Sequence, residues 1–166
     1  RNNVSYSNMR YGLHFMFSDD ETYQHNTFRN NGAGVSVMYT HRITMLNNTF
    51  IENWGSSMYG MLLKEITDSR IEGNHFIRNT TGISMETSER ITVVNNDFIS
   101  NGWAIRVYAS CDDNHFTRNN FKGISFDVTT NGTLKNNYFS DNYWDKYDGY
   151  DLNKDGIGDI PYRPIS

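Results

Sequence analysis

The chain has 166 residues and a formal net charge of −4, so it can bury the core of one domain but offers no basic surface for a phosphate backbone. This balance argues against nucleic acid as a partner, and no run approaches the roughly 18 apolar residues of a membrane-spanning helix. A single cysteine, Cys111, excludes an internal disulfide framework and is interpreted as a packing residue.

The first predicted element is the short run GLHFMFSDD, Gly12 to Asp20. Apolar residues alternate along it with His14 and Met16, and two acids end it. Alternation of this kind predicts a strand whose successive side chains face opposite ways. Similar runs follow small residues further along the chain, as GVSVM, GMLLK, GISME, AIRVY and GISFD.

A motif of the form Asn-x-Phe-x-x-Asn follows each of these runs. Its copies begin at Asn26, Asn48, Asn74, Asn96, Asn114 and Asn137. A period near 22 residues, with short strands and no helical periodicity, predicts an all-β, right-handed parallel β-helix, a solenoid with one repeat per coil. The rival, an antiparallel sandwich, needs hairpin signals every roughly 8–12 residues and no such register.

The repeat also gives a structural reason for 22 asparagines, a residue that suits neither helix nor strand interiors. Coils stacked about 4.8 Å apart would bring asparagines into register, so that each amide bonds to the next in a ladder. The ring stack predicted inside the same wall contains Phe28, Phe50, Phe76, Phe98 and Phe139.

Alignment of the runs on their first small residue assigns a face to each column. Positions +1 and +3 are apolar and are predicted to point inward. Positions +2 and +4 are mixed and are predicted to point outward. The +2 column is His14, Ser36, Leu62, Ser84, Arg106 and Ser125, and the +4 column is Met16, Met38, Lys64, Glu86, Tyr108 and Asp127.

Met16 and Met38 are therefore predicted outward neighbours on adjacent coils, with His14 on the same face. Thioether and imidazole groups together suit soft or borderline metals, Cu(I) above all, so these three residues form a candidate copper site. The alternative is that a loop, a partner or further coils cover this apolar face, since methionine is common at adaptable contacts. Met58, in an insert before Gly60, is a candidate to lie over the same region.

The outward acids allow a second reading. In β-helix enzymes that act on polysaccharides, outward carboxylates work as acid/base pairs or calcium ligands. Glu86 and Asp127 fall in one column with Tyr108 between them, which leaves a carbohydrate-binding or polysaccharide-cleaving protein as the alternative function. A solvated polar face is the simpler interpretation.

The pattern changes after Asn142, so residues 1–142 are predicted to form the coils and residues 143–166 a capping tail rich in Asp, Gly and aromatic residues. Within the tail, oxygen-bearing side chains follow the opening of an EF-hand loop, which makes them candidate calcium ligands: Asp151, Asn153, Asp155 and Asp159. Tyr162 replaces the final glutamate, and the prolines forbid a following helix, so this is not an EF-hand. The alternative is an acidic turn cluster without a metal.

Four segments, taken in order, resemble the NosD family: GLHFMFSDD, GVSVMYTHRITMLNN, YGMLLKEITDSRIEGN and NYWDKYDGYDLNKDGIGDIPYRP. The resemblance runs through essentially the whole chain. Family members are longer, with a signal peptide and further N-terminal coils, which agrees with a start at Arg1 as an excised or processed piece.

The resemblance implies a periplasmic, non-enzymatic protein that assists the maturation of nitrous oxide reductase. Its implied partners are an ABC-type ATPase with its membrane subunit, a copper chaperone lipoprotein and the apo-reductase. The implied cargo is copper, or a sulfur species. The family supplies no ligand assignment, so the copper candidates rest on the column pattern alone.

Overall fold

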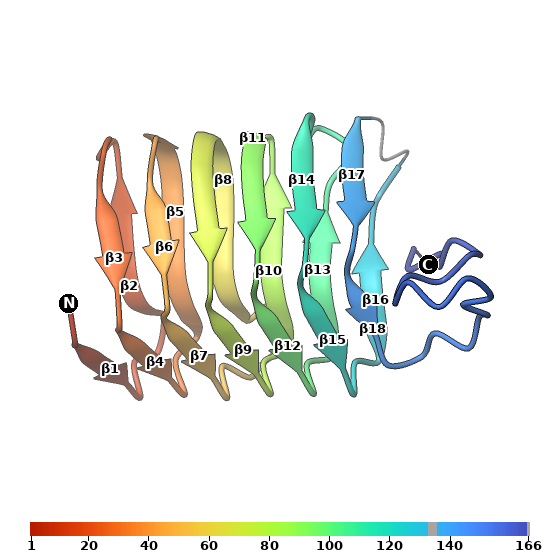
Figure 1. Cartoon of the computed structure of the whole chain (residues 1–166). Coiled ribbons are helices and arrows are strands. Elements are labelled where there is room, and N and C mark those ends of the chain that lie inside the picture. Colours follow the sequence, from red (N-terminus) through yellow and green to blue (C-terminus); the bar gives the residue numbers. More distant parts are fainter. Residues whose placement is uncertain (133–135, 166) are drawn as a thin grey trace.

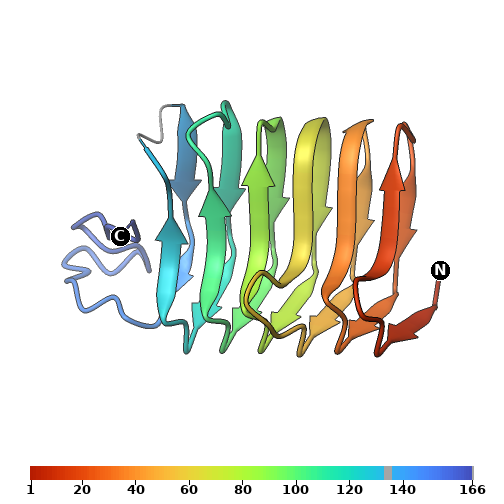
Figure 2. The ribbon, with the colours of Figure 1, turned by 180° about the vertical axis from the view of Figure 1, so that it is seen from behind.

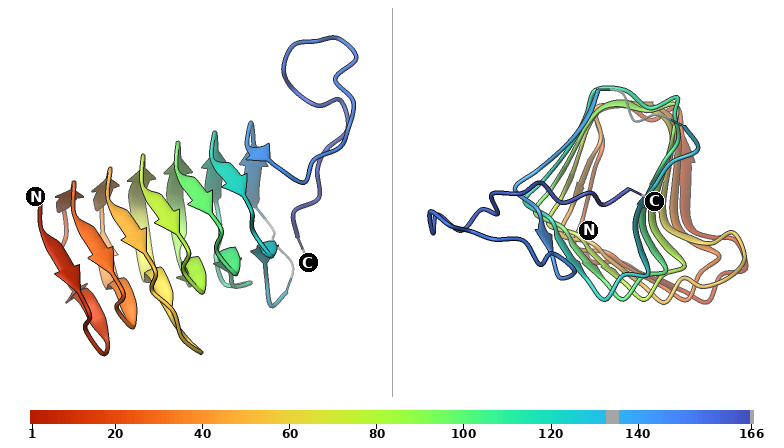
Figure 3. Two further views of the ribbon diagram at one scale, coloured as in Figure 1. Left: turned by 90° about the horizontal axis from the view of Figure 1, so that it is seen from below. Right: turned by 90° about the vertical axis from the view of Figure 1, so that its right-hand side faces the viewer.

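The chain winds into a right-handed parallel β-helix, as the repeat predicts. The computed structural model describes residues 1–132 and 136–165, and these residues form strands and turns without a helix, in about six turns. In Figure 1 the strands stand side by side along one axis, with the N-terminus at one end and the C-terminal tail at the other. Figure 3 shows the outline of the coils from the end.

Each coil contributes strands to three walls. Wall A is the seven-stranded parallel sheet: β1 (Val4–Tyr6), β4 (Thr27–Arg29), β7 (Thr49–Ile51), β9 (His75–Ile77), β12 (Asp97–Ile99), β15 (Asn120–Lys122) and β18 (Tyr143–Trp144). Walls B and C together form the eleven-stranded sheet, because β8 (Tyr59–Glu72) bends through both. The remaining strands of wall B are β2 (Tyr11–Met16), β5 (Ala33–His41), β10 (Thr81–Glu86), β13 (Trp103–Val107) and β16 (Phe126–Thr129). Those of wall C are β3 (Thr22–Gln24), β6 (Thr44–Leu46), β11 (Glu89–Val94), β14 (Asn114–Thr117) and β17 (Asn137–Ser140).

Two asparagine ladders run along the coils and confirm the predicted amide stacking. In the first, the backbone N–H of each rung donates to the side-chain oxygen of the next at 2.8–3.0 Å, through Asn3, Asn26, Asn48, Asn74, Asn96, Asn119 and Asn142. The second passes through Asn8, Asn31, Asn53, Asn79 and Asn101. Each inner rung is buried with its polar atoms paired, so the interior tolerates this many amides.

The ring stack beside the first ladder confirms the prediction in four coils and corrects it in the last two. Phe28, Phe50, Phe76 and Phe98 stack with centroids 4.9–5.2 Å apart, but the next rings are Phe121 and Trp144. Phe139 packs on Phe116 in wall C instead. The reason is that the Asn-x-Phe motif recurs in wall C, where Asn114 pairs with Asn137, while Asn119 continues the first ladder after Asn96.

Small residues at the start of wall B make room for these rings. A side chain at Gly60 would put its Cβ 2.8 Å from the Gly82 carbonyl oxygen and 3.1 Å from the Phe76 ring. The column therefore needs glycine or alanine wherever another coil follows, and it reads Gly12, Gly34, Gly60, Gly82 and Ala104. Its sixth member, Asp127, sits in the last coil of the wall, since Trp103 pairs with Phe126.

This register corrects the predicted faces of the sixth coil. The partner of Ile105 is Val128, so Thr129 and not Ser125 continues the +2 column. Asp127 was predicted to point outward beside Glu86, but it is buried and accepts hydrogen bonds from Lys146 Nζ at 3.3 Å and the Tyr162 hydroxyl at 2.8 Å. Both donors belong to the tail, which folds back over this end of the helix, where Val128 N–H donates to the Pro164 carbonyl.

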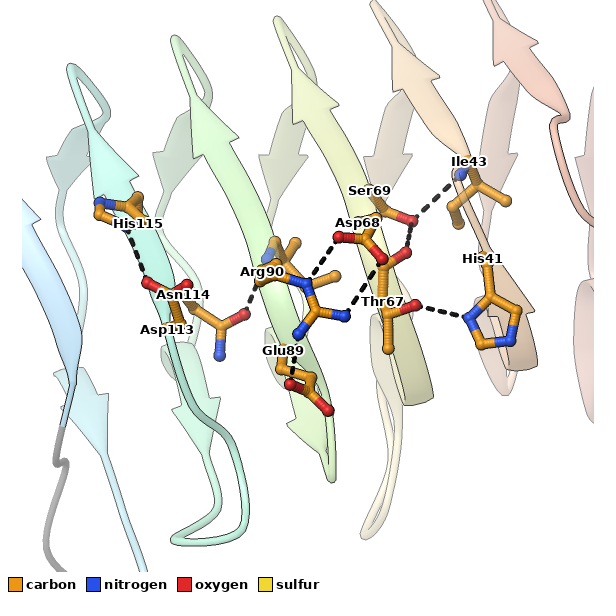
Figure 4. Close-up of polar contacts among 11 residues, drawn as sticks. His41, Ile43, Thr67, Asp68, Ser69, Glu89, Arg90, Asp113, Asn114 and His115 are labelled. Carbon is orange, nitrogen blue, oxygen red and sulfur yellow. Dashed lines mark hydrogen bonds and ion pairs between the residues drawn. The ribbon is translucent and has the colours of Figure 1, made fainter.

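Residues with positive φ form the corners between walls. At the corner between walls B and C their charges alternate along the axis, as Asp20, Arg42, Asp68, Arg90 and Asp113. Arg90 Nε donates to Asp68 at 2.7 Å, and Arg90 Nη1 donates to Glu89 at 2.6 Å, as Figure 4 shows. Asp20 and Asp68 have pKa values below the ordinary value because an arginine guanidinium bonds to each. Ion pairs therefore join neighbouring coils at this edge, between Asp20 and Arg42 and between Asp68 and Arg90.

Candidate functional site

Met16 and Met38 lie side by side on the outer face of wall B, as predicted from their columns. They are direct register partners on the first two coils, where neighbouring strands lie about 4.8 Å apart. Met16 is 40% exposed and Met38 is half-buried. The strands hold them outward because Leu13, Val35 and Val37 occupy the inward positions. Two thioethers on adjacent coils therefore face solvent together.

His14 lies on the same face, and its ring stacks on that of Tyr11 with centroids 4.8 Å apart. It is exposed, and its register partner is Ser36 on the next coil. A second stack, of Phe17 on Tyr39 with centroids 5.2 Å apart, follows the two methionines directly in sequence. The first two coils thus present a patch of sulfur, imidazole and aromatic groups.

The +4 column changes character beyond the second coil. Met38 pairs with Lys64, whose ammonium approaches the Glu86 carboxylate at 4.0 Å. The acids that close the opening stretch are also engaged. Asp20 receives two hydrogen bonds from Arg42, and Asp19 accepts one from the His41 N–H at 2.9 Å. Both acids thus form hydrogen bonds at the corner between walls B and C. Among the described residues, no carboxylate contact to either methionine is seen.

The other histidines are spread over separate corners and walls. His41 Nδ1 lies 2.5 Å from the Thr67 hydroxyl, and His115 lies 3.3 Å from Asp113, both drawn in Figure 4. His75 lies 3.0 Å from Asp97 in wall A. Within residues 1–132 and 136–165, no group of three or more His, Cys, Asp or Glu side chains could hold a metal.

Met58 lies in a loop and packs within it. It belongs to the insert between β7 and β8, and its side-chain atoms pack against Gly55 of the same loop. Cys111 is buried, and burial raises the pKa of its thiol, so it packs and does not present a thiolate.

The four candidate calcium residues lie in one exposed loop of the tail. Asp151 accepts hydrogen bonds from the N–H groups of Asp155 and Gly156, at 3.2 and 3.0 Å. Asp159 accepts one from the Leu152 N–H at 2.7 Å, and Asn153 Nδ2 donates to Asp155. These bonds form an ordinary acidic turn, so a calcium ion there stays a prediction.

The predicted acid pair does not exist on the outer face. Glu86 faces outward, but Asp127 lies inside the last coil, so the two carboxylates cannot act together on one substrate. Sequence reasoning also missed the aromatic residues that precede three of the five small residues, at Tyr11, Tyr59 and Trp103. Their signal was present at position −1, but the alignment began one residue later.

One family model matches the chain. It covers residues 1–149 and is described as periplasmic copper-binding protein (NosD). No curated protein matches the chain. In the part of the chain that the structure describes, no helix is long and apolar enough to cross a membrane.

Proposed function

We propose that this chain, which belongs to the NosD family of periplasmic copper-binding proteins, is an accessory protein that passes copper to apo nitrous oxide reductase. In this proposal it performs no catalysis. It works with an ABC-type ATPase, the membrane subunit of that transporter and a copper chaperone lipoprotein. A sulfur species is the alternative cargo.

One observation carries the proposal, namely the in-register pair Met16 and Met38 on the outer face of wall B. Outward methionines gain nothing from water, so an exposed and a half-buried methionine paired on adjacent coils need a reason. Thioethers and imidazole are soft and borderline donors, which fits them to Cu(I) better than to hard cations. His14 is available as a third donor on the same face.

The arrangement suits transfer more than storage. Two or three neutral donors on an open strand surface hold a soft ion without enclosing it, and a partner can approach from solvent. The role of wall B is to fix the spacing of the thioethers, because both side chains project from paired backbone. The adjacent Phe17 and Tyr39 rings offer apolar contact to a docking protein.

The test is an anaerobic Cu(I) titration of the chain against a competing chelator, repeated with the double variant Met16→Leu/Met38→Leu. Leucine keeps the apolar bulk and removes the sulfur, so we expect copper binding by the parent and its loss in the double variant. Met9→Leu is the matched control, since Met9 is 96% exposed and lies outside the paired column. Binding that survives in the double variant would move the site elsewhere.

Absence of copper binding by the parent would reject the copper contact and leave the same face as a docking surface. A pull-down of the chaperone lipoprotein or the apo-reductase, with the same variants, then tests that reading. Copper content of the reductase matured in cells with parent or variant chain tests the place of the protein in the pathway.

A further inference from the structure

A cavity of about 240 Å³ lies at the carboxyl ends of β13 and β16, in the last two coils of wall B. Wall B faces the viewer in Figure 2, where these two strands stand next to the C-terminal tail. The residues that line the cavity are Arg106, Val107, Tyr108, Thr129, Thr130 and Asn131. Because a water molecule in the liquid occupies about 30 Å³, the cavity has room for a ligand of several heavy atoms.

The guanidinium of Arg106 is held in place but is not neutralised. It lies over the ring of Trp103, 4.6 Å from the centroid, and that ring stacks on Phe126 with centroids 5.4 Å apart. Stacking engages the flat face of a guanidinium and leaves the N–H groups at its edge free to donate. In the described part of the chain, no carboxylate forms an ion pair with Arg106. A half-buried cation with free donors and no counter-ion attracts an anion.

Thr129 provides a second, independent observation at the same cavity. It is the register partner of Arg106 on the next coil. Its Oγ1 atom is buried and has no hydrogen-bond partner within the residues that the structure describes. A buried hydroxyl without a partner is costly, so this group needs a partner, and the cavity that it lines can hold one.

The other polar side chains around the cavity are also available as donors. Asn131 Oδ1 accepts a hydrogen bond from the Ala109 N–H at 2.7 Å, which leaves its Nδ2 group to donate. Thr130 Oγ1 accepts one from the Gly132 N–H at 3.2 Å and keeps its own proton for a second bond. The Tyr108 hydroxyl is a further donor. None of the lining residues is acidic, so the cavity offers hydrogen-bond donors around one positive charge.

Two acids at neighbouring positions are already paired with lysines. Glu86 occupies the +4 column one coil before Tyr108, and its carboxylate lies 4.0 Å from Lys64 Nζ. Asp127 is buried inside the last coil, and its carboxylate lies 3.3 Å from Lys146 Nζ. Both carboxylates are thus compensated by other cations, and the charge that faces the cavity is that of the Arg106 guanidinium.

We infer that this cavity binds a free tetrahedral oxyanion of the size of phosphate or sulfate. The edge of the Arg106 guanidinium donates to it in the bidentate manner that arginine uses with phosphate groups, and the Thr129 hydroxyl donates to a further oxygen. Tyr108, Thr130 and Asn131 complete the ring of donors. A neutral ligand would leave the guanidinium uncompensated, and a cation would be repelled by it. The assignment does not rest on the copper transfer proposed above.

The test is isothermal titration of the chain with sodium phosphate and with sodium sulfate, at an ionic strength held constant with sodium chloride. We expect saturable binding of at least one of the two, weakened by about tenfold or more in Arg106→Gln, which removes the charged donors. Arg29→Gln is the matched control, because Arg29 also lies over an aromatic ring, 6.0 Å from the centroid of Tyr6, but does not line the cavity. Equal weakening by the two variants would indicate a general effect of protein charge and would overturn the assignment.

A second variant separates binding from folding. Thr129→Val keeps the branched shape and removes the unpaired buried hydroxyl, so the unliganded protein should unfold at an equal or higher urea concentration. Because the hydroxyl donates to the ligand, oxyanion affinity should nevertheless fall, by about tenfold. An unchanged affinity would show that Thr129 does not contact the ligand, and that result would overturn the assignment.

Failure of both anions to bind would also overturn it, as would acetate that binds as tightly as phosphate. Binding to phosphatidylglycerol vesicles without binding of free phosphate would assign the face to a lipid surface and overturn the assignment of a free ion. A Cu(I) titration of Arg106→Gln and Thr129→Val should match the parent, because the variants avoid Met16, Met38 and His14. The oxyanion site and the copper role therefore fail or stand separately.

Discussion

The inner and outer columns of wall B are built from the same strands but follow different rules from coil to coil. Inside, each position repeats one kind of residue, as in the glycine column and the Asn and Phe stacks beside it. Outside, the residue type varies from coil to coil, as in the column of Tyr11, Ala33, Tyr59, Thr81, Trp103 and Phe126, and the methionine pair gives way to charges. Stacking inside the coils requires repetition, whereas an outward position meets solvent and can vary from coil to coil.

The largest expected effect comes from breaking an inner repeat. Asn74 is buried, and its side chain bonds to Asn48, to Asn96 and to the Met45 carbonyl. Asn74→Ala leaves the buried Asn48 N–H and Met45 oxygen without partners, which should destabilise the fold by about 4 kcal/mol. The urea midpoint followed by circular dichroism measures this loss.

The matched control is the exposed end of the same ladder, where the Asn3 side chain donates to Asn26. Asn3→Ala should cost less than about 1 kcal/mol, because water replaces the amide. Equal losses at the two positions would show that the ladder is not stabilised by burial.

An intermediate effect is expected in the last coil, where the buried Asp127 replaces the repeating glycine and bonds to the tail. Burial and the bond to Asp127 raise the pKa of Tyr162 from 10.0 to about 12. The folded state thus holds the phenolic proton more tightly than the unfolded state, so this contribution is present below pH 10 and is lost as the pH rises towards 12. Trp144, whose ring centroid lies 5.2 Å from that of Tyr162, should report tail release by fluorescence over this range.

Tyr162→Phe should remove this pH dependence, since the ring remains and the titrating proton does not. Parent and variant that lose the tail over the same alkaline range would assign the transition to another group.

The smallest effect is expected at the outer corner. Arg90→Gln removes the guanidinium that bridges Asp68 and Glu89 on the exposed surface. Surface ion pairs contribute little and are screened by salt, so the small drop in urea midpoint should disappear near 1 M NaCl, where the Debye length is about 3 Å. Arg118→Gln is the control, because Arg118 also has positive φ but donates to the Asn95 amide. A drop that persists in salt would indicate packing by the arginine stem.

The regular coils were predictable from sequence, because repetition leaves a visible period. Phe28 to Phe98 and their asparagines were placed correctly for this reason. The error at Phe139 arose because the same Asn-x-Phe motif recurs in wall C, where Phe139 packs on Phe116. Asp127 was misplaced because an end coil has no successor to exclude a side chain from the glycine column.

The candidate site was predictable only in part. Alternation along one strand correctly placed Met16 and Met38 outside and in register. It could not reveal that Ser36 and Ser84 are buried on the same face, because their burial depends on bulky neighbours one coil away. Burial of this kind depends on residues from neighbouring coils, so the sequence of a single strand does not predict it.

The loop between β7 and β8 lengthens one coil to 26 residues, yet the bond from Asn53 to Asn79 that spans it keeps the ladder geometry at 3.1 Å. Coil length and coil position are therefore uncoupled at this corner. A short epitope or a fluorescent label could therefore be inserted between Gly55 and Met58 without displacing the asparagine ladder, and it would mark the protein at the edge of wall B.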